Sequence, residues 1–149
     1  MRKFLLPIIN LVNLILVSIT WGLSNNTAVT DAGAKNAAKG TFYDVIWTGE
    51  KPNALAIVGF FLFIFACVAV LAAFIPTKAR KFVTCAGSAM LIASGVIFLL
   101  SPREKFYDCS ILEPELTGSL IAMAVLVFIA GAFMACMSLI EFLGKKESK

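Results

Sequence analysis

The sequence predicts an all-α integral membrane protein, folded as a single bundle of four transmembrane helices. The composition is the first observation, because 60% of the 149 residues are hydrophobic and only 15% are charged, whereas about a quarter of a soluble domain is charged. The hydrophobic residues also gather in four runs of about 20 residues or more, enough to cross a hydrocarbon core of roughly 30 Å at about 1.5 Å per residue. The basic residues, finally, concentrate in the short segments beside these runs.

We expect helices at residues 4–23, 54–75, 82–100 and 116–143, outer loops at 24–53 and 101–115, and one domain over 1–149. The link between the second and third helices, residues 76–81, contains three basic residues and no acidic one. The first run is open to a second interpretation as a cleaved signal peptide. We favour a retained helix, because the run is long for a signal-peptide core and no small-residue cleavage site follows it.

The basic residues predict the orientation of the chain. Those in the three shortest segments are Arg2, Lys3, Lys78, Arg80, Lys81, Lys145, Lys146 and Lys149. Because positively charged short segments stay in the cytoplasm, both termini are expected there. These basic residues, expected in the cytoplasm, account for the net charge of +4. Since no basic patch is interleaved with stacking aromatic residues, we expect no nucleic-acid partner. The loops are compact, and the cysteines give no sign of disulfide bonds. Both observations favour a bacterial plasma membrane.

The first helix contains two asparagines. Asn10 and Asn13 are three residues apart and therefore share a face. Carboxamides facing lipid are costly, so we expect this face to turn inward against other helices or water. Two interpretations stay open. The asparagines form hydrogen bonds between helices, or together with Thr20 they line a polar path for a substrate or ion.

Small residues recur along the third and fourth helices. Cys85, Ala89 and Ala93 are spaced four residues apart, and Gly131 and Ala135 repeat this spacing. Such small-xxx-small patterns let a neighbouring helix approach closely. We therefore predict that these positions pack against another helix.

The outer loops contain aromatic segments that predict contacts outside the bundle. Residues 41–48 are β-branched and aromatic, which is typical of a short strand or of a segment lying at the membrane interface. Phe42-Tyr43-Asp44 recurs in the second loop as Phe106-Tyr107-Asp108, and Trp47 lies nearby. If this match is a repeat rather than chance, the chain consists of two repeated helix hairpins whose outer segments pair as strands.

The sequence predicts no catalytic residue, cofactor or metal site. It has no histidine, so histidine-based acid–base catalysis is excluded, and it has no Cys-x-x-Cys motif. The four expected helices contain no ionisable side chain deep in the apolar run, which argues against a proton-coupled pump. Cys109, the one cysteine expected in an outer loop, is open to three interpretations: a free thiol, a lipid attachment site or a disulfide to another chain.

The arrangement of four helices with a longer first outer loop resembles that of the tetraspan proteins, claudins included. The first outer loop has Trp47 but lacks the Gly-Leu-Trp motif and cysteine pair of claudins, and the second lacks the Cys-Cys-Gly motif of tetraspanins, so we assign no family. The leading hypothesis is a non-enzymatic accessory or scaffold component that contacts the bilayer and binds other membrane proteins or itself. The alternative is a subunit of an oligomeric channel or transporter. A lipid-acting enzyme that uses Asp44 and Asp108 ranks third.

Overall fold

The computed structural model describes residues 2–31, 39–47, 53–101 and 114–144. Within them lie four long helices: α1 (Arg2–Leu23), α3 (Ala54–Ala72), α4 (Arg80–Leu100) and α5 (Gly118–Gly144). All four are long and apolar enough to cross a membrane. The prediction of four long apolar helices is therefore confirmed.

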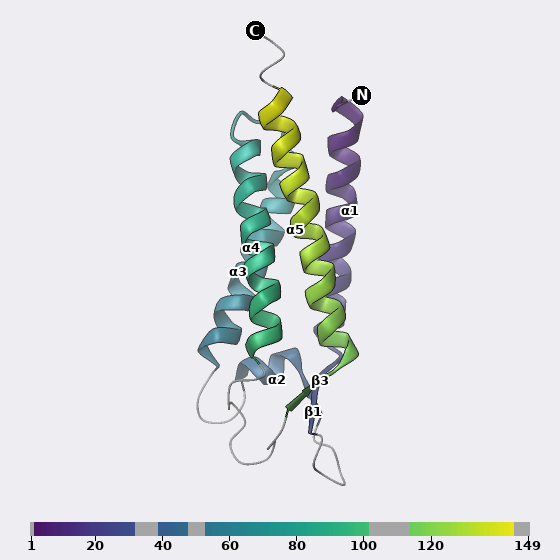
Figure 1. Ribbon diagram of the computed structural model, residues 1–149, viewed down its shortest axis with the longest axis vertical. Coiled ribbons are helices and arrows are strands. Elements are labelled where there is room, and N and C mark those ends of the chain that lie inside the picture. The colour runs from purple at the N-terminus through teal and green to yellow at the C-terminus, as the bar shows by residue number, and fades with distance from the viewer. Residues whose placement is uncertain (1, 32–38, 48–52, 102–113, 145–149) are drawn as a thin grey trace.

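The four helices lie lengthwise beside one another, and α1 starts at the same end of the bundle at which α5 ends (Figure 1). The last helix, α5, is central to the arrangement because it packs extensively against both α4 and α1, while α3 packs mainly against α4. The contact between α1 and α3 is thin by comparison. The first and last helices of the chain are thus neighbours in space.

The ends of α3 and α4 show why the predicted bounds shift by a few residues. Asn53 caps the start of α3, since its Oδ1 accepts a hydrogen bond from the Ala56 amide at 2.8 Å. The helix ends at Ala72 rather than at Ile75, because tighter turns take over before Pro76. The helix α4 begins at Arg80, two residues before the apolar run, so its first turn includes charged residues.

Three short strands join the two outer loops. They are β1 (Thr27–Asp31), β2 (Lys39–Thr41) and β3 (Pro114–Leu116), and they form an antiparallel sheet in the order β2-β1-β3. In the register between the loops, Val29 lies opposite Leu116 and Thr30 opposite Glu115. The outer loops therefore pair, but not through the segments that the sequence suggested. The repeat itself stays a prediction, because Phe106, Tyr107 and Asp108 lie outside the described residues.

Of the two interpretations of residues 41–48, the strand is wrong for residues 42–47, and the interfacial segment stays a prediction; residue 48 lies outside the described residues. Beyond Thr41, which ends β2, the chain forms a short helix, α2 (Phe42–Trp47). Phe42 and Ile46 are four residues apart on this helix, and both are almost fully buried. Burial of this pair against the end of the bundle outweighs the strand preference of the aromatic and β-branched residues.

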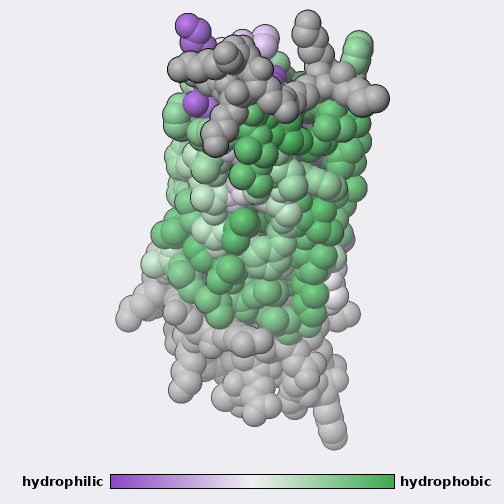
Figure 2. Space-filling view, turned by 45° about the horizontal axis from the view of Figure 1, so that its top comes forward, coloured by the Kyte–Doolittle hydropathy of each residue, from purple (hydrophilic) through white to green (hydrophobic). Residues whose placement is uncertain are grey.

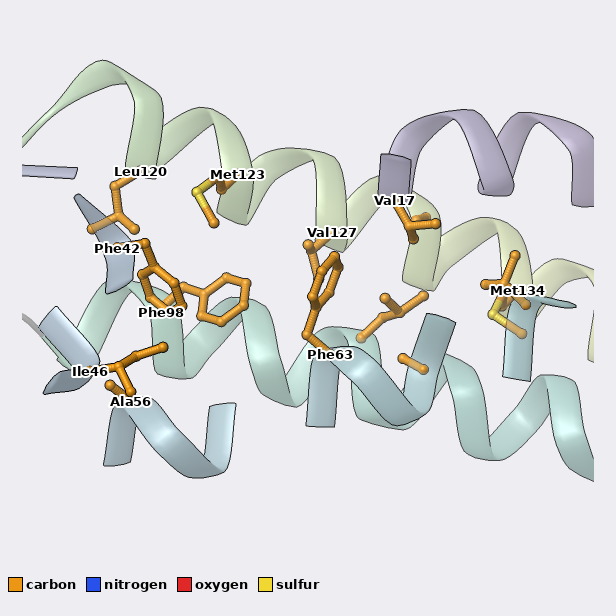
Figure 3. Close-up of a cluster of buried hydrophobic side chains, with 14 residues drawn as sticks. Val17, Phe42, Ile46, Ala56, Phe63, Phe98, Leu120, Met123, Val127 and Met134 are labelled. Carbon is orange, nitrogen blue, oxygen red and sulfur yellow. The ribbon is translucent and has the colours of Figure 1, made fainter. Parts of the chain in front are cut away.

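The core is continuous from α2 into the bundle (Figure 3). The ring of Phe42 contacts that of Phe98 edge to face, with centroids 4.7 Å apart, and Phe98 contacts Phe63 at 5.9 Å. On the outside, hydrophobic residues cover the helical body, and hydrophilic residues gather where α1 starts and α5 ends (Figure 2). Side chains such as Phe61 and Phe65, both more than half exposed, would be unfavourable in water over so large an area and suit contact with lipid.

Candidate functional site

The polar face of α1 lies inside the bundle. Asn10 and Asn13 are 1% and 0% exposed. The Nδ2 of Asn10 donates a hydrogen bond to the main-chain oxygen of Val70 on α3, at 3.0 Å. The Nδ2 of Asn13 lies 3.9 Å from the sulfur of Met137 on α5, a weak acceptor. The two carboxamides therefore connect α1 to two different helices.

The bond from Asn10 completes the end of α3. The last four carbonyls of a helix lack donors from their own helix. Val70 lies in this last turn, and the N–H of Phe74, four residues further along, bonds instead to the carbonyl of Leu71 at 3.2 Å. Asn10 supplies the donor from a neighbouring helix, and so acts as a cap between helices.

The acceptor atoms of the same two side chains are not satisfied. The Oδ1 atoms of Asn10 and Asn13 are buried and have no hydrogen-bond partner within the described residues. Thr20 is also fully buried, but its hydroxyl donates to the carbonyl of Leu16 in its own helix at 2.9 Å. The asparagine oxygens are thus the buried polar atoms of this face that make no hydrogen bond within the described residues.

A groove runs between α1 and α3, where their contact is thin. Its volume is about 160 Å³, and it is lined by Leu14, Val17, Ser18, Trp21, Cys67 and Leu71. Trp21 is held in place by Phe60 and Phe63 of α3, with ring centroids 5.8 Å and 6.1 Å away. Ser18 donates its hydroxyl proton to the Leu14 carbonyl, which leaves the hydroxyl oxygen as an acceptor in an otherwise apolar groove.

The short helix α2 covers the outer end of the bundle. The hydroxyls of Ser24 and Tyr43 are hydrogen-bonded to each other at 3.2 Å, and the main-chain N–H of Asn53 donates to the Ile46 carbonyl at 3.2 Å. The Asn53 side chain also donates to the carbonyl of Ser101 at 3.2 Å. Phe42 and Tyr43 therefore contact the bundle itself. Nothing is described for the side chains of Asp44 and Trp47 or for Phe106, Tyr107 and Asp108, so a role for them in outer contacts stays a prediction.

The small residues of α4 divide between two faces. Cys85 and Ala89 are exposed and Ala93 is half-buried, so this stripe faces outward from the bundle. The buried face of α4 is instead Thr84, Gly87, Ser88, Leu91, Ser94, Gly95 and Phe98. A Cβ atom at Gly87 would lie 2.9 Å from the Cβ of Ala69, which shows how closely α3 and α4 approach there.

On α5, Gly131 lies at the contact with α4 and Ala135 is half-buried. Ser88 donates its hydroxyl proton to the carbonyl of Gly131 at 2.8 Å, a contact that a side chain at residue 131 would crowd. Sequence reasoning missed the inward position of Ser88 because small residues occur on both the buried and the exposed face of α4, and small size alone does not tell which stripe faces inward.

Sequence reasoning also missed the ion pair between Arg80 and Glu141. Their side chains are 18% and 12% exposed, and they join the start of α4 to the end of α5. The signal was present, since both residues lie at the ends of apolar runs expected on the same side of the membrane.

Within the described residues, no group of three or more histidine, cysteine, aspartate or glutamate side chains is arranged to hold a metal ion. Comparison of the chain with models of protein families, with characterised proteins and with solved structures finds no match.

Proposed function

We propose that this chain crosses a membrane four times with both termini in the cytoplasm, and that it serves as a non-enzymatic component that binds another membrane protein. The topology is supported by the basic residues where α3 connects to α4, namely Lys78 in the link and Arg80 and Lys81 in the first turn of α4. This connection lies at the same end of the bundle as the start of α1 and the end of α5 (Figure 1). The bacterial plasma membrane is proposed on the composition of the chain alone.

The groove between α1 and α3 carries the proposal of a binding role. In a bilayer, a groove of this size is filled either by a lipid chain or by side chains of a neighbouring helix. The acceptor oxygen of Ser18 favours a helix, because a lipid chain has no hydrogen-bond donor to offer at this depth. The half-buried Cys67 opposite is small enough to admit a side chain from a partner. The proposed occupant is a transmembrane helix of another membrane protein.

Site-specific photocrosslinking in native membranes tests this proposal. A photoreactive amino acid in place of Ser18 should give an adduct with one protein of defined mass, whereas the same residue in place of Ile92, exposed on α4, should give lipid adducts only. Cys67→Phe fills the groove and should abolish the protein adduct. Cys85→Phe makes the same change on the exposed surface of α4 and should leave the adduct intact.

Two results would reject the groove as a binding site. The first is the same set of adducts from both crosslinker positions. The second is a protein adduct that survives Cys67→Phe when the variant melts at the wild-type temperature.

A second function is favoured by the Oδ1 atoms of Asn10 and Asn13, which have no hydrogen-bond partner in the part of the chain that the structure describes. In an oligomer these oxygens would line a polar path for a solute or ion. The path predicts that Asn13→Leu reduces flux into reconstituted vesicles without lowering the stability of the protein, because the Asn13 amide makes only a weak contact with sulfur. Wild-type vesicles that show no flux above empty ones, or Asn13→Leu vesicles that keep full flux, would exclude the path.

A further inference from the structure

At the end of the bundle that carries the link between α3 and α4, a lysine lies beside two aromatic rings. The Nζ of Lys81 is 4.8 Å from the ring centroid of Phe82 on α4 and 4.8 Å from that of Phe142 on α5. The two rings contact each other edge to face at 6.0 Å. Both distances from the ammonium suit a cation–π interaction. The charge of Lys81 is therefore held where α4 meets α5.

The main chain of Lys81 is fixed from both helices. Its carbonyl accepts hydrogen bonds from the hydroxyls of Thr84 on α4 and Ser138 on α5, each at 3.1 Å. Phe82 is 60% exposed and Phe142 is 43% exposed. The rings thus present the ammonium at the outer, lipid-facing side of the bundle rather than within it.

Glu141 does not neutralise Lys81. Glu141, one residue before Phe142, pairs with Arg80 instead. Within the described residues Lys81 has no acidic partner, and no residue in the first turn of α4 is acidic. The start of a helix carries a partial positive charge and favours anions. Lys81 lies there without an acidic partner among the described residues, so an anion from outside the chain would relieve an unfavourable arrangement of charge.

The exposed surface of α4 and α5 next to Lys81 is apolar. The exposed residues that follow Phe82 on α4 include the small Cys85, Ala86 and Ala89, and those that precede Phe142 on α5 include Cys136 and Leu139. An alkyl chain can lie against this apolar surface, which continues along α4 as far as the exposed Ile92. A ligand with a negatively charged headgroup on hydrocarbon chains complements a cation that lies next to an apolar surface.

We propose that Lys81, with the rings of Phe82 and Phe142, binds the headgroup phosphate of an anionic phospholipid. Lysine commonly binds phosphate as a point charge, and basic residues beside a transmembrane helix attract anionic lipid. The inference rests on the proposed insertion into a membrane and is independent of the groove between α1 and α3. Lys78, which is exposed in the link and makes no contact with an aromatic ring within the described residues, serves as the matched control.

Lipid titration of the purified full chain in mild detergent, read by native mass spectrometry, tests the site. Phosphatidylglycerol should bind more tightly than phosphatidylcholine with the same acyl chains. Lys81→Gln should weaken phosphatidylglycerol binding about fivefold, the factor expected for one lysine at an anionic surface, and leave phosphatidylcholine unchanged. Lys78→Gln, which removes the same charge, should change the affinity by less than about twofold if the aromatic contact positions the cation.

Equal losses in Lys81→Gln and Lys78→Gln would mean diffuse attraction and overturn the site, as would no loss in Lys81→Gln. If Lys81→Gln proves unstable, Phe142→Leu keeps the charge and removes one ring, and unchanged selectivity in that variant would also reject the proposal. Displacement of the lipid by equimolar inorganic phosphate would assign the site to free phosphate instead. Cys67→Phe should bind phosphatidylglycerol normally, so failure of the groove and failure of the lipid site are distinguishable.

Discussion

Asn10→Leu tests whether the polar face of α1 stabilises the bundle. Leucine has nearly the same length as asparagine but no donor, so the carbonyl of Val70 loses the hydrogen bond that it receives at 3.0 Å. A buried group left without its partner costs about 1–3 kcal/mol. Part of this cost is offset, because the substitution also removes the buried Oδ1 that has no partner within the described residues.

Hydrogen bonds between membrane helices contribute about 0.6 kcal/mol on average and about 1.7 kcal/mol at most. We therefore expect Asn10→Leu to lower the free energy of unfolding by about 1–2 kcal/mol, since the orphaned carbonyl adds to the lost bond. Asn13→Leu is the matched control. Its donor reaches only a sulfur atom at 3.9 Å, so leucine should be neutral or stabilising there.

Reversible unfolding in mixed micelles, followed by circular dichroism, measures both variants against the wild type. The expected result is a clear loss for Asn10→Leu and none for Asn13→Leu. Equal losses, or a larger loss for Asn13→Leu, would refute the assignment of Asn10 as the donor that completes the end of α3.

Three further predictions concern stability. Gly87→Ala should destabilise the protein by about 1 kcal/mol, because overpacking costs about 1–3 kcal/mol and the better helix propensity of alanine returns less than about 1 kcal/mol. In the control Gly22→Ala the added methyl group meets nothing within 4 Å, so this variant should melt like the wild type. Glu141→Gln should lower the free energy of unfolding by about 1–3 kcal/mol, because it leaves the charge of Arg80 unpaired. The double variant Arg80→Glu with Glu141→Arg should recover much of this stability. If thermal melts show no recovery, the ion pair does not stabilise the protein. Asn53→Ala removes the cap of α3 and should cost about 1–2 kcal/mol, and a melting curve unchanged from the wild type would contradict the role of this cap.

The long helices follow from the sequence because a bilayer imposes a length on every apolar run that crosses it. Burial of Asn10 and Asn13 follows equally, since carboxamides are costly against lipid. What they bond to does not follow, because it depends on where α3 and α5 pass α1. Whether the stripe of Ala89 or that of Ser88 faces the bundle does not follow from the sequence either, because it is set by the rotation of α4 about its axis.

The short elements at the outer end were harder to predict. Residues 42–47 have strand-like composition, yet four-residue spacing of Phe42 and Ile46 proved the stronger signal once a hydrophobic surface lay beneath them. The pairing of β1 with β3 joins segments that are far apart in the chain. Strands of five and three residues are too short for a hydrophobic pattern that would predict this pairing and its register.

The adjacency of α1 and α5 has a consequence for biosynthesis. The ribosome delivers α1 first and α5 last, and α1 has little contact with α3 to hold it in the interval. Until α5 is made, Asn13 lacks its contact with Met137, the part of the buried face of α4 that packs against α5 is uncovered, and β3 has not yet joined the sheet. The contacts that join α1 and α4 to α5 can therefore form only after α5 has been synthesised, so the bundle is completed late.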